Sequence, residues 1–129
     1  MTYRYPSRPE PPALAGLDLT VRAGETLALV GPSGAGKSTL ISLLLRFADP
    51  QTGAIRLDGV DLRDADPTDL RRRMALVAQS PILFTGTVRE NIRFGDPQAR
   101  DTALFEAAEA ANCTAFIGAL PQGMDTHIG

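Results

Sequence analysis

Two short runs of almost continuous apolar residues stand out along the chain. They are residues 26–30 and residues 74–78. A strand that helices cover on both faces reads as a continuous apolar run, whereas a strand with one solvated face alternates. We therefore predict that both runs are buried parallel strands, which is typical of an α/β fold.

Other segments carry the patterns of helices or of half-buried strands. Residues 1–5 and 14–21 alternate between apolar and polar, which predicts an N-terminal antiparallel β subdomain. Residues 54–57 predict a short strand closed by Asp58 and Gly59. Helices are predicted from near Lys37 through the apolar residues 40–45, from Asp66 to residue 72 or 73, over 88–94, from Asp101 as the capping residue, and over 116–120. The helix after Asp101 has the apolar stripe Leu104, Ala107, Ala108 and Ala111.

The loop between the first apolar run and the first helix matches the P-loop pattern G-x-x-x-x-G-K-[ST]. Strand, glycine-rich loop and helix is the context that this motif needs. Its residues are Gly31, Pro32, Ser33, Gly34, Ala35, Gly36, Lys37, Ser38 and Thr39.

Phosphate chemistry explains these residue types. Glycines let the backbone approach a phosphate closely, and the start of the helix offers unpaired N–H groups and a positive dipole end. Lys37 is predicted to reach the β- and γ-phosphates of ATP, Ser38 to bind Mg²⁺, and Thr39 to donate to a phosphate oxygen. The alternative is a glycine-rich turn with a chance lysine. Against it, Lys37 is the only lysine among thirteen basic residues.

Composition narrows the classes of function. The net charge of −2 gives no electrostatic case for a nucleic-acid partner. Cys113 is the only cysteine and His127 the only histidine, so an internal disulfide is impossible and a zinc site is excluded. The sequence contains no run of eighteen apolar residues, so it predicts no membrane-spanning helix within residues 1–129.

Three further stretches accompany the P-loop. They are Tyr3-Arg4-Tyr5-Pro6, residues 77–84 and residues 87–92. Together the four stretches resemble, in order and spacing, an ABC-transporter nucleotide-binding domain, most closely of the exporter type. The resemblance covers essentially the whole chain. It implies a P-loop NTPase core with a parallel sheet and flanking helices, an N-terminal antiparallel β subdomain, and the cofactors ATP and Mg²⁺.

The resemblance assigns roles to two further residues. Tyr5 matches the aromatic residue that stacks on the adenine ring, although a strand aromatic packed in the core beside Tyr3 is the alternative. Gln79 matches the glutamine of the Q-loop, which coordinates Mg²⁺ or positions the attacking water. The alternative for Gln79 is a polar residue that ends a strand. Lys37 and Gln79 are thus the candidate catalytic residues.

The resemblance also implies partners. The segment 80–91, which begins with Ser80 and ends with Asn91, is similar to the surface that receives the coupling helix of a transmembrane domain. Its apolar residues Ile82, Leu83 and Phe84 suit either that contact or local packing. A second nucleotide-binding domain would complete a head-to-tail dimer at the cytoplasmic face of a membrane.

The hydrolytic motifs of this family have no match here. The signature sequence, the aspartate–glutamate pair after a later strand, and the switch histidine are all missing, so residues 1–129 read as a partial ABC-type ATP-binding domain truncated before the signature. Such a chain binds Mg-ATP at most. Two alternatives stay open: a soluble ABC-type ATPase without a transport role, and a non-catalytic nucleotide-binding fragment.

Marginal stability follows from this prediction. Without the neighbouring aspartate strand, the predicted strand at residues 26–30 would present an unpaired apolar edge, and such edges promote association. We expect the isolated chain to self-associate in sedimentation velocity and to lack a sharp thermal transition. A monomeric profile with a cooperative transition would contradict this expectation.

Overall fold

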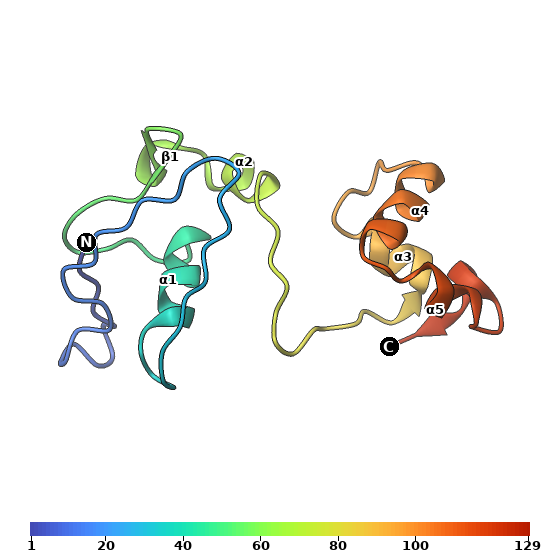
Figure 1. The fold of residues 1–129 in the computed structure, drawn as a ribbon, viewed down its shortest axis with the longest axis horizontal. Helices are drawn as coiled ribbons and strands as arrows, with labels where there is room; N and C mark the ends of the chain where they lie inside the picture. The colour runs from blue at the N-terminus through green and yellow to red at the C-terminus, as the bar shows by residue number, and fades with distance from the viewer. The chain divides into compact units, whose positions relative to one another are not determined.

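The computed structural model describes residues 1–129, which form two compact units. The first unit is Met1–Leu76 and the second is Val77–Gly129, and each is described by itself. Both are drawn in Figure 1, coloured from blue at the N-terminus to red at the C-terminus.

The first unit contains two α-helices, a hairpin and a short 3₁₀ helix. They are α1 (Lys37–Leu44), β1 (Arg56–Leu57), β2 (Val60–Asp61), η1 (Leu62–Asp64) and α2 (Pro67–Arg72). β1 and β2 are antiparallel, with Leu57 opposite Val60. Asp58 and Gly59 between them have φ of 51° and 82°, the positive values that a two-residue type I′ turn requires. The predicted strand and its turn are confirmed.

The predicted helices of this unit are also confirmed. Helix α1 begins at Lys37 and buries Thr39, Leu40 and Leu43, the last being 1% exposed. Helix α2 has Pro67 at its first position. The Asp66 carboxylate accepts from the first free amides of α2. These residues fix the start of α2, because a side-chain acceptor replaces the missing backbone acceptors.

The N-terminal β subdomain is formed only as isolated bridges. Thr2 pairs with Thr52, and Tyr3 pairs with Leu14, but no continuous strand follows over residues 15–21. Tyr3 is 6% exposed and its carbonyl accepts from the amides of Ala13 and Leu14. The alternating pattern therefore includes the residues of one paired contact, between Tyr3 and Leu14, but the prediction of a strand over 14–21 is wrong.

The predicted parallel sheet is not formed. Residues 26–30 and 74–78 contain no strand, and the two sheets present are antiparallel pairs. Val30 is 89% and Val77 95% exposed. An apolar run becomes a strand only through ladder hydrogen bonds with a neighbour, and residues 26–30 make no backbone hydrogen bond to another segment. The expected strand edge is thus an exposed extended segment.

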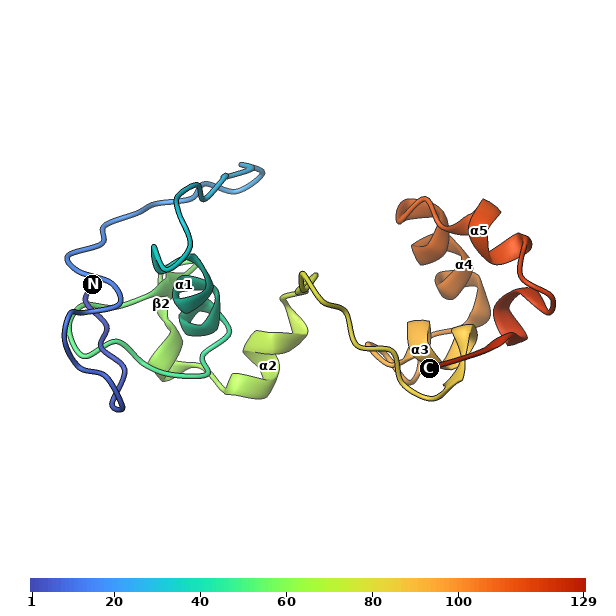
Figure 2. The same cartoon turned by 90° about the horizontal axis from the view of Figure 1, so that it is seen from below.

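The second unit packs short helices against one another, with one short strand pair beside α3 (Figures 1 and 2). Its elements are β3 (Gly86–Thr87), α3 (Val88–Arg93), α4 (Asp101–Ala110), α5 (Thr114–Gly118), η2 (Gly123–Asp125) and β4 (His127–Ile128). β3 and β4 are antiparallel. The core consists of one buried side chain from each of α3, α4, α5 and η2, namely Val88, Ala108, Ile117 and Met124. These four side chains hold the helices of the unit together.

Two helix predictions in this unit need correction. α4 starts at Asp101 itself, with Arg100 in the cap position and no side-chain cap bond, so Asp101 is not the capping residue. Of its predicted stripe, Leu104 and Ala108 are buried, whereas Ala107 and Ala111 are exposed. α5 begins two residues before the predicted start. The helix before them, α3, begins and ends close to its predicted bounds.

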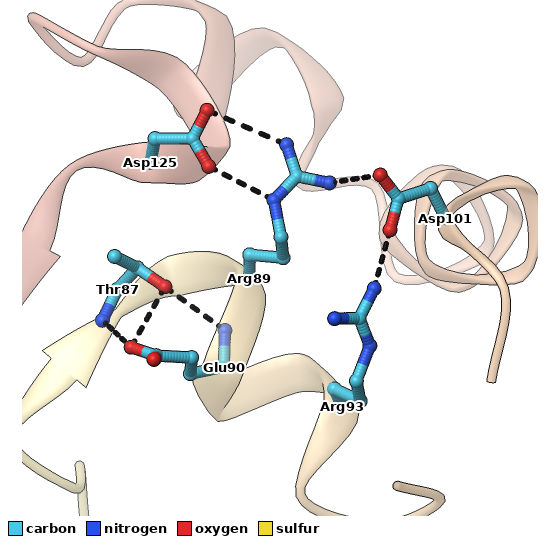
Figure 3. Close-up of polar contacts among 6 residues, drawn as sticks. All are labelled: Thr87, Arg89, Glu90, Arg93, Asp101 and Asp125. Carbon is cyan, nitrogen blue, oxygen red and sulfur yellow. Dashed lines mark hydrogen bonds and ion pairs between the residues drawn. The ribbon is translucent and has the colours of Figure 1, made fainter. Parts of the chain in front are cut away.

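An ion-pair network joins α3 to α4 and η2 (Figure 3). The Arg89 guanidinium donates to Asp101 at 2.5 Å and to Asp125 at 2.9 Å. Arg93 donates to the other oxygen of Asp101. The hydrogen bond from Arg89 holds the pKa of Asp125 below its usual value. Asp101 is therefore shared by two arginines, and it lies at the first helical position of α4, one residue after the cap position.

Acid should weaken this network. Because the pKa of Asp125 is lower in the folded chain, its stabilising effect is full above the unfolded pKa of about 3.9 and is lost as the pH falls through the folded value. We expect the urea midpoint of the second unit to fall between pH 6 and pH 3. The fall should be smaller in Asp125→Asn, which has no carboxylate to protonate. An equal fall in both proteins would contradict the role of Asp125.

Candidate functional site

The loop of residues 31–39 needs glycine at Gly36 for two reasons. Gly36 has φ of 88°, in the left-handed region, and it stands in the cap position of α1. A Cβ atom there would lie 2.7 Å from the carbonyl oxygen of Ala13 and 2.7 Å from a methyl carbon of Leu14. Gly34 also has a positive φ, of 80°, but nothing lies within 4 Å of its Cβ position. Only Gly36 thus permits the close approach of another backbone segment.

The amides at the start of α1 have no protein acceptor. The N–H groups of Gly36, Lys37, Ser38 and Thr39 donate to no backbone or side-chain oxygen, and α1 has no side-chain cap. Gly34 likewise has an unpaired N–H. Successive unpaired amides at a helix start, with the positive end of the helix dipole behind them, form an anion-binding cradle. The loop therefore fits a phosphate group.

The Lys37 ammonium lies back across this loop. Its Nζ donates to the carbonyl oxygens of Gly31 at 2.6 Å and Pro32 at 2.7 Å. An ammonium has three donors, so these two bonds leave one hydrogen free. Ser38 is exposed, and its hydroxyl makes no hydrogen bond within the chain. The positive charge and the free hydroxyl are thus both on the loop.

Tyr5 contacts the same loop from a distant part of the chain. Its phenol oxygen is 2.8 Å from Oγ1 of Thr39, thirty-four residues away. Tyr5 is 41% exposed, whereas Tyr3 is buried and meets the Tyr5 ring edge-on with centroids 5.1 Å apart. Tyr3 is therefore the core aromatic residue of the pair, and Tyr5 is the one beside the loop.

Gln79 belongs to the second unit, while the loop belongs to the first. Gln79 is exposed and follows an extended segment, not a strand. Its role at Mg²⁺ or the attacking water therefore stays a prediction. No group of three His, Cys, Asp or Glu side chains comes together as a metal site. On the loop, Ser38 offers an exposed side-chain oxygen to Mg²⁺.

Asn91 organises the segment that precedes α3, a role that the sequence did not predict. Its Oδ1 accepts from the amide of Phe84 at 2.8 Å, and its Nδ2 donates to the carbonyls of Phe84 and Thr87 at 2.8 Å and 3.0 Å. Thr87 and Glu90 add a reciprocal capping box. The pattern Thr87-x-x-Glu90 is the signal from which this box could have been predicted.

The apolar residues of this segment remain in contact with solvent. Ile82 is 80%, Leu83 58% and Phe84 48% exposed, and the Phe84 ring stacks on the exposed Phe94 ring with centroids 4.2 Å apart. Local packing therefore accounts for one face of Phe84 and leaves Ile82 and Leu83 uncovered within the chain.

Comparison with known proteins decides the family. The family model described as ABC transporter matches residues 14–127. This chain belongs to the ABC transporter family. Membership of this family implies the P-loop NTPase fold class and nucleotide binding, which agrees with the unpaired amides of the loop.

Individual relatives resemble the chain along its whole length. It is 44% identical over 129 residues to "ABC transporter B family member 21" of Arabidopsis thaliana, covering 100% of this chain and 10% of that protein. It is 48% identical over 130 residues to "Mitochondrial potassium channel ATP-binding subunit" of Xenopus tropicalis, covering 100% and 19%. It is 48% identical over 127 residues to "Multidrug resistance protein pgp-1" of Caenorhabditis elegans, covering 98% and 10%.

The chain therefore spans a fifth or less of the length of these ABC transporter relatives. None of its helices has both the length and the apolar character needed to cross a bilayer. The residues that match the family model include the P-loop of this chain. The family relationship therefore applies directly to the loop.

The contact at Gly36 predicts a difference between two glycines of the loop. Gly36→Ala should lower the free energy of unfolding of the first unit by more than Gly34→Ala. Both substitutions strain a left-handed residue by about 1 kcal/mol, but only the first drives a Cβ into Ala13 and Leu14. Urea unfolding of both variants measures this difference. Equal losses would show that the approach of residues 13–14 to the loop does not stabilise the unit.

Proposed function

We propose that this chain is the ATP-binding part of an ABC exporter, which couples ATP binding and hydrolysis to movement of a substrate across a membrane. The main support is that the backbone amides of residues 36–39 have no hydrogen-bond acceptor, in a chain that belongs to the ABC transporter family. A triphosphate supplies the acceptors that these donors lack, and the loop glycines let it come close.

Binding would exchange the internal bonds of the loop for bonds to ATP. The Lys37 ammonium, held by two neutral carbonyls, would move to the β- and γ-phosphate oxygens, which carry full negative charge and bind an ammonium more strongly. Ser38 would place its hydroxyl on Mg²⁺, with Gln79 as a further oxygen ligand. Thr39 would donate to a phosphate oxygen.

Tyr5 is proposed as the platform for the adenine ring. Its position beside the loop supports this role, because a base attached to a bound phosphate chain must lie nearby. Its exposure leaves ring surface available for stacking, which supplies contact area without reading a particular base edge.

ATP hydrolysis would require the longer protein of which this chain is proposed to be a part. Water would attack the γ-phosphate, with Lys37 stabilising the charge that develops and Gln79 orienting the water or the metal ion. A second nucleotide-binding domain would pack head-to-tail against this one and complete the site. The chain itself is proposed as a partial domain whose contribution is to bind Mg-ATP.

The proposal favours an exporter over a soluble ATPase because of segment 80–91. Ile82 and Leu83 are exposed on a segment that Asn91 holds in place, which suits contact with a transmembrane domain at the cytoplasmic face of a membrane. Relatives bear transporter names such as "ABC transporter B family member 21". Because the Xenopus relative is named for a potassium channel, no substrate class is proposed.

Isothermal titration calorimetry with Mg-ATP tests the nucleotide site. Lys37→Ala should weaken binding at least tenfold, because hydrogen bonds to a charged group contribute about 1.5–3 kcal/mol each. Lys37→Arg should also bind more weakly, since a planar guanidinium does not replace a compact ammonium in a narrow loop. The matched control is Arg73→Ala, which removes one exposed positive charge of the same unit outside the loop.

Two results would contradict the proposal. If the wild-type chain showed no saturable binding of Mg-ATP, nucleotide binding would not be a function of this chain. Equal affinities of wild type, Lys37→Ala and Arg73→Ala would show that any binding is electrostatic and independent of the loop.

A further inference from the structure

The hydroxyl of Thr39 already has a partner within the chain. The phenol oxygen of Tyr5 lies 2.8 Å from its Oγ1, and this is the one side-chain hydrogen bond that Thr39 makes. Thr39 is 6% exposed, so little of its surface is open to an incoming group. The Tyr5 hydroxyl therefore contacts the Thr39 hydroxyl, which in the proposed function donates a hydrogen bond to a phosphate.

A hydroxyl carries a single proton to donate. Thr39 cannot give that proton to the phenol and to a phosphate oxygen at once. Where the phenol is the donor, Thr39 keeps its own proton, and the phenol competes with a phosphate only for space beside Oγ1, on a side chain that is 6% exposed. The phenol and a phosphate therefore compete for the proton of Thr39 in the first arrangement and for the space around Oγ1 in the second.

We propose that the Tyr5–Thr39 hydrogen bond is an autoinhibitory contact, which nucleotide binding must break. The inference rests on the proposed function and adds a second role for Tyr5. Its hydroxyl opposes binding of the phosphate chain, while its ring favours binding of the base. Breaking the contact releases Thr39 for the phosphate, while the exposed Tyr5 ring remains available for stacking.

The two groups of Tyr5 can be separated chemically. Tyr5→Phe removes the hydroxyl and keeps the ring, whereas Tyr5→Ala removes both. Inorganic tripolyphosphate has the phosphates of ATP but no base, so its binding responds to the hydroxyl alone. The matched control is Tyr3→Phe, which deletes a phenol hydroxyl that makes no hydrogen bond in this structure.

Titration calorimetry of the full chain with Mg-ATP and with Mg-tripolyphosphate tests the contact. Tyr5→Phe should bind both ligands about two- to tenfold more tightly, the effect expected for removal of one competing hydrogen bond. Tyr5→Ala should bind tripolyphosphate as tightly as Tyr5→Phe does, but ATP more weakly than Tyr5→Phe. Tyr3→Phe should match wild type for both ligands.

Other patterns overturn the inference. Unchanged or weaker tripolyphosphate binding by Tyr5→Phe would mean that the phenol does not oppose the phosphates, and weaker binding would indicate that it supports Thr39 as a donor. Loss of all binding in wild type and in every Tyr5 variant would instead refute the proposed nucleotide site. The two failures are therefore distinguishable.

A second measurement avoids substitution at Tyr5. The chain has two tyrosines and no tryptophan, so Tyr5 is the sole source of aromatic emission above that of phenylalanine in Tyr3→Phe. Addition of Mg-tripolyphosphate should produce a saturable change in that emission as the phenol leaves Thr39. Calorimetric binding without any change in emission would show that the contact persists in the complex and would overturn the inference.

Discussion

A helix that begins without a side-chain cap leaves its first amide groups without acceptors, and this constraint governs the first unit. Two other helices of the chain resolve the same problem locally, since Asp66 caps α2 and Thr87 caps α3, whereas α4 and α5 also begin without a side-chain cap. Helix α1 has glycine in the cap position and no such acceptor. The loop before it leaves these amides without protein acceptors, and the Lys37 ammonium donates to two carbonyl oxygens of the same loop. The chain thus keeps a set of unsatisfied donors where an anion can use them.

Local signals in the sequence predicted the elements whose causes are local. Asp66 and Pro67 start a helix through contacts within four residues, and Asp58-Gly59 turns a hairpin through its own dihedral angles. The P-loop pattern located Lys37 and the start of α1 for the same reason. These features depend on residue type at fixed short spacing, which a single sequence displays.

The predictions that were wrong or missing concern features that depend on residues distant in sequence. Residues 26–30 have the composition of a buried strand, but a strand exists only where another backbone segment pairs with it. The contact between Tyr5 and Thr39 joins residues thirty-four positions apart, and no local pattern indicates it. The ion pairs of Asp101 with Arg89 and Arg93 likewise join residues that are eight to twelve positions apart, and no local pattern indicates them.

The hydrogen bonds of Asn91 have a mechanical consequence. Because its amide group binds both the N–H and the carbonyl of Phe84, the end of the exposed segment cannot slide along α3 without breaking two bonds together. Arg89, two residues before Asn91, links the same helix to Asp101 and Asp125. A force applied at Ile82 or Leu83 would therefore reach α3 through the hydrogen bonds of Asn91, and α4 and η2 through the ion pairs of Arg89.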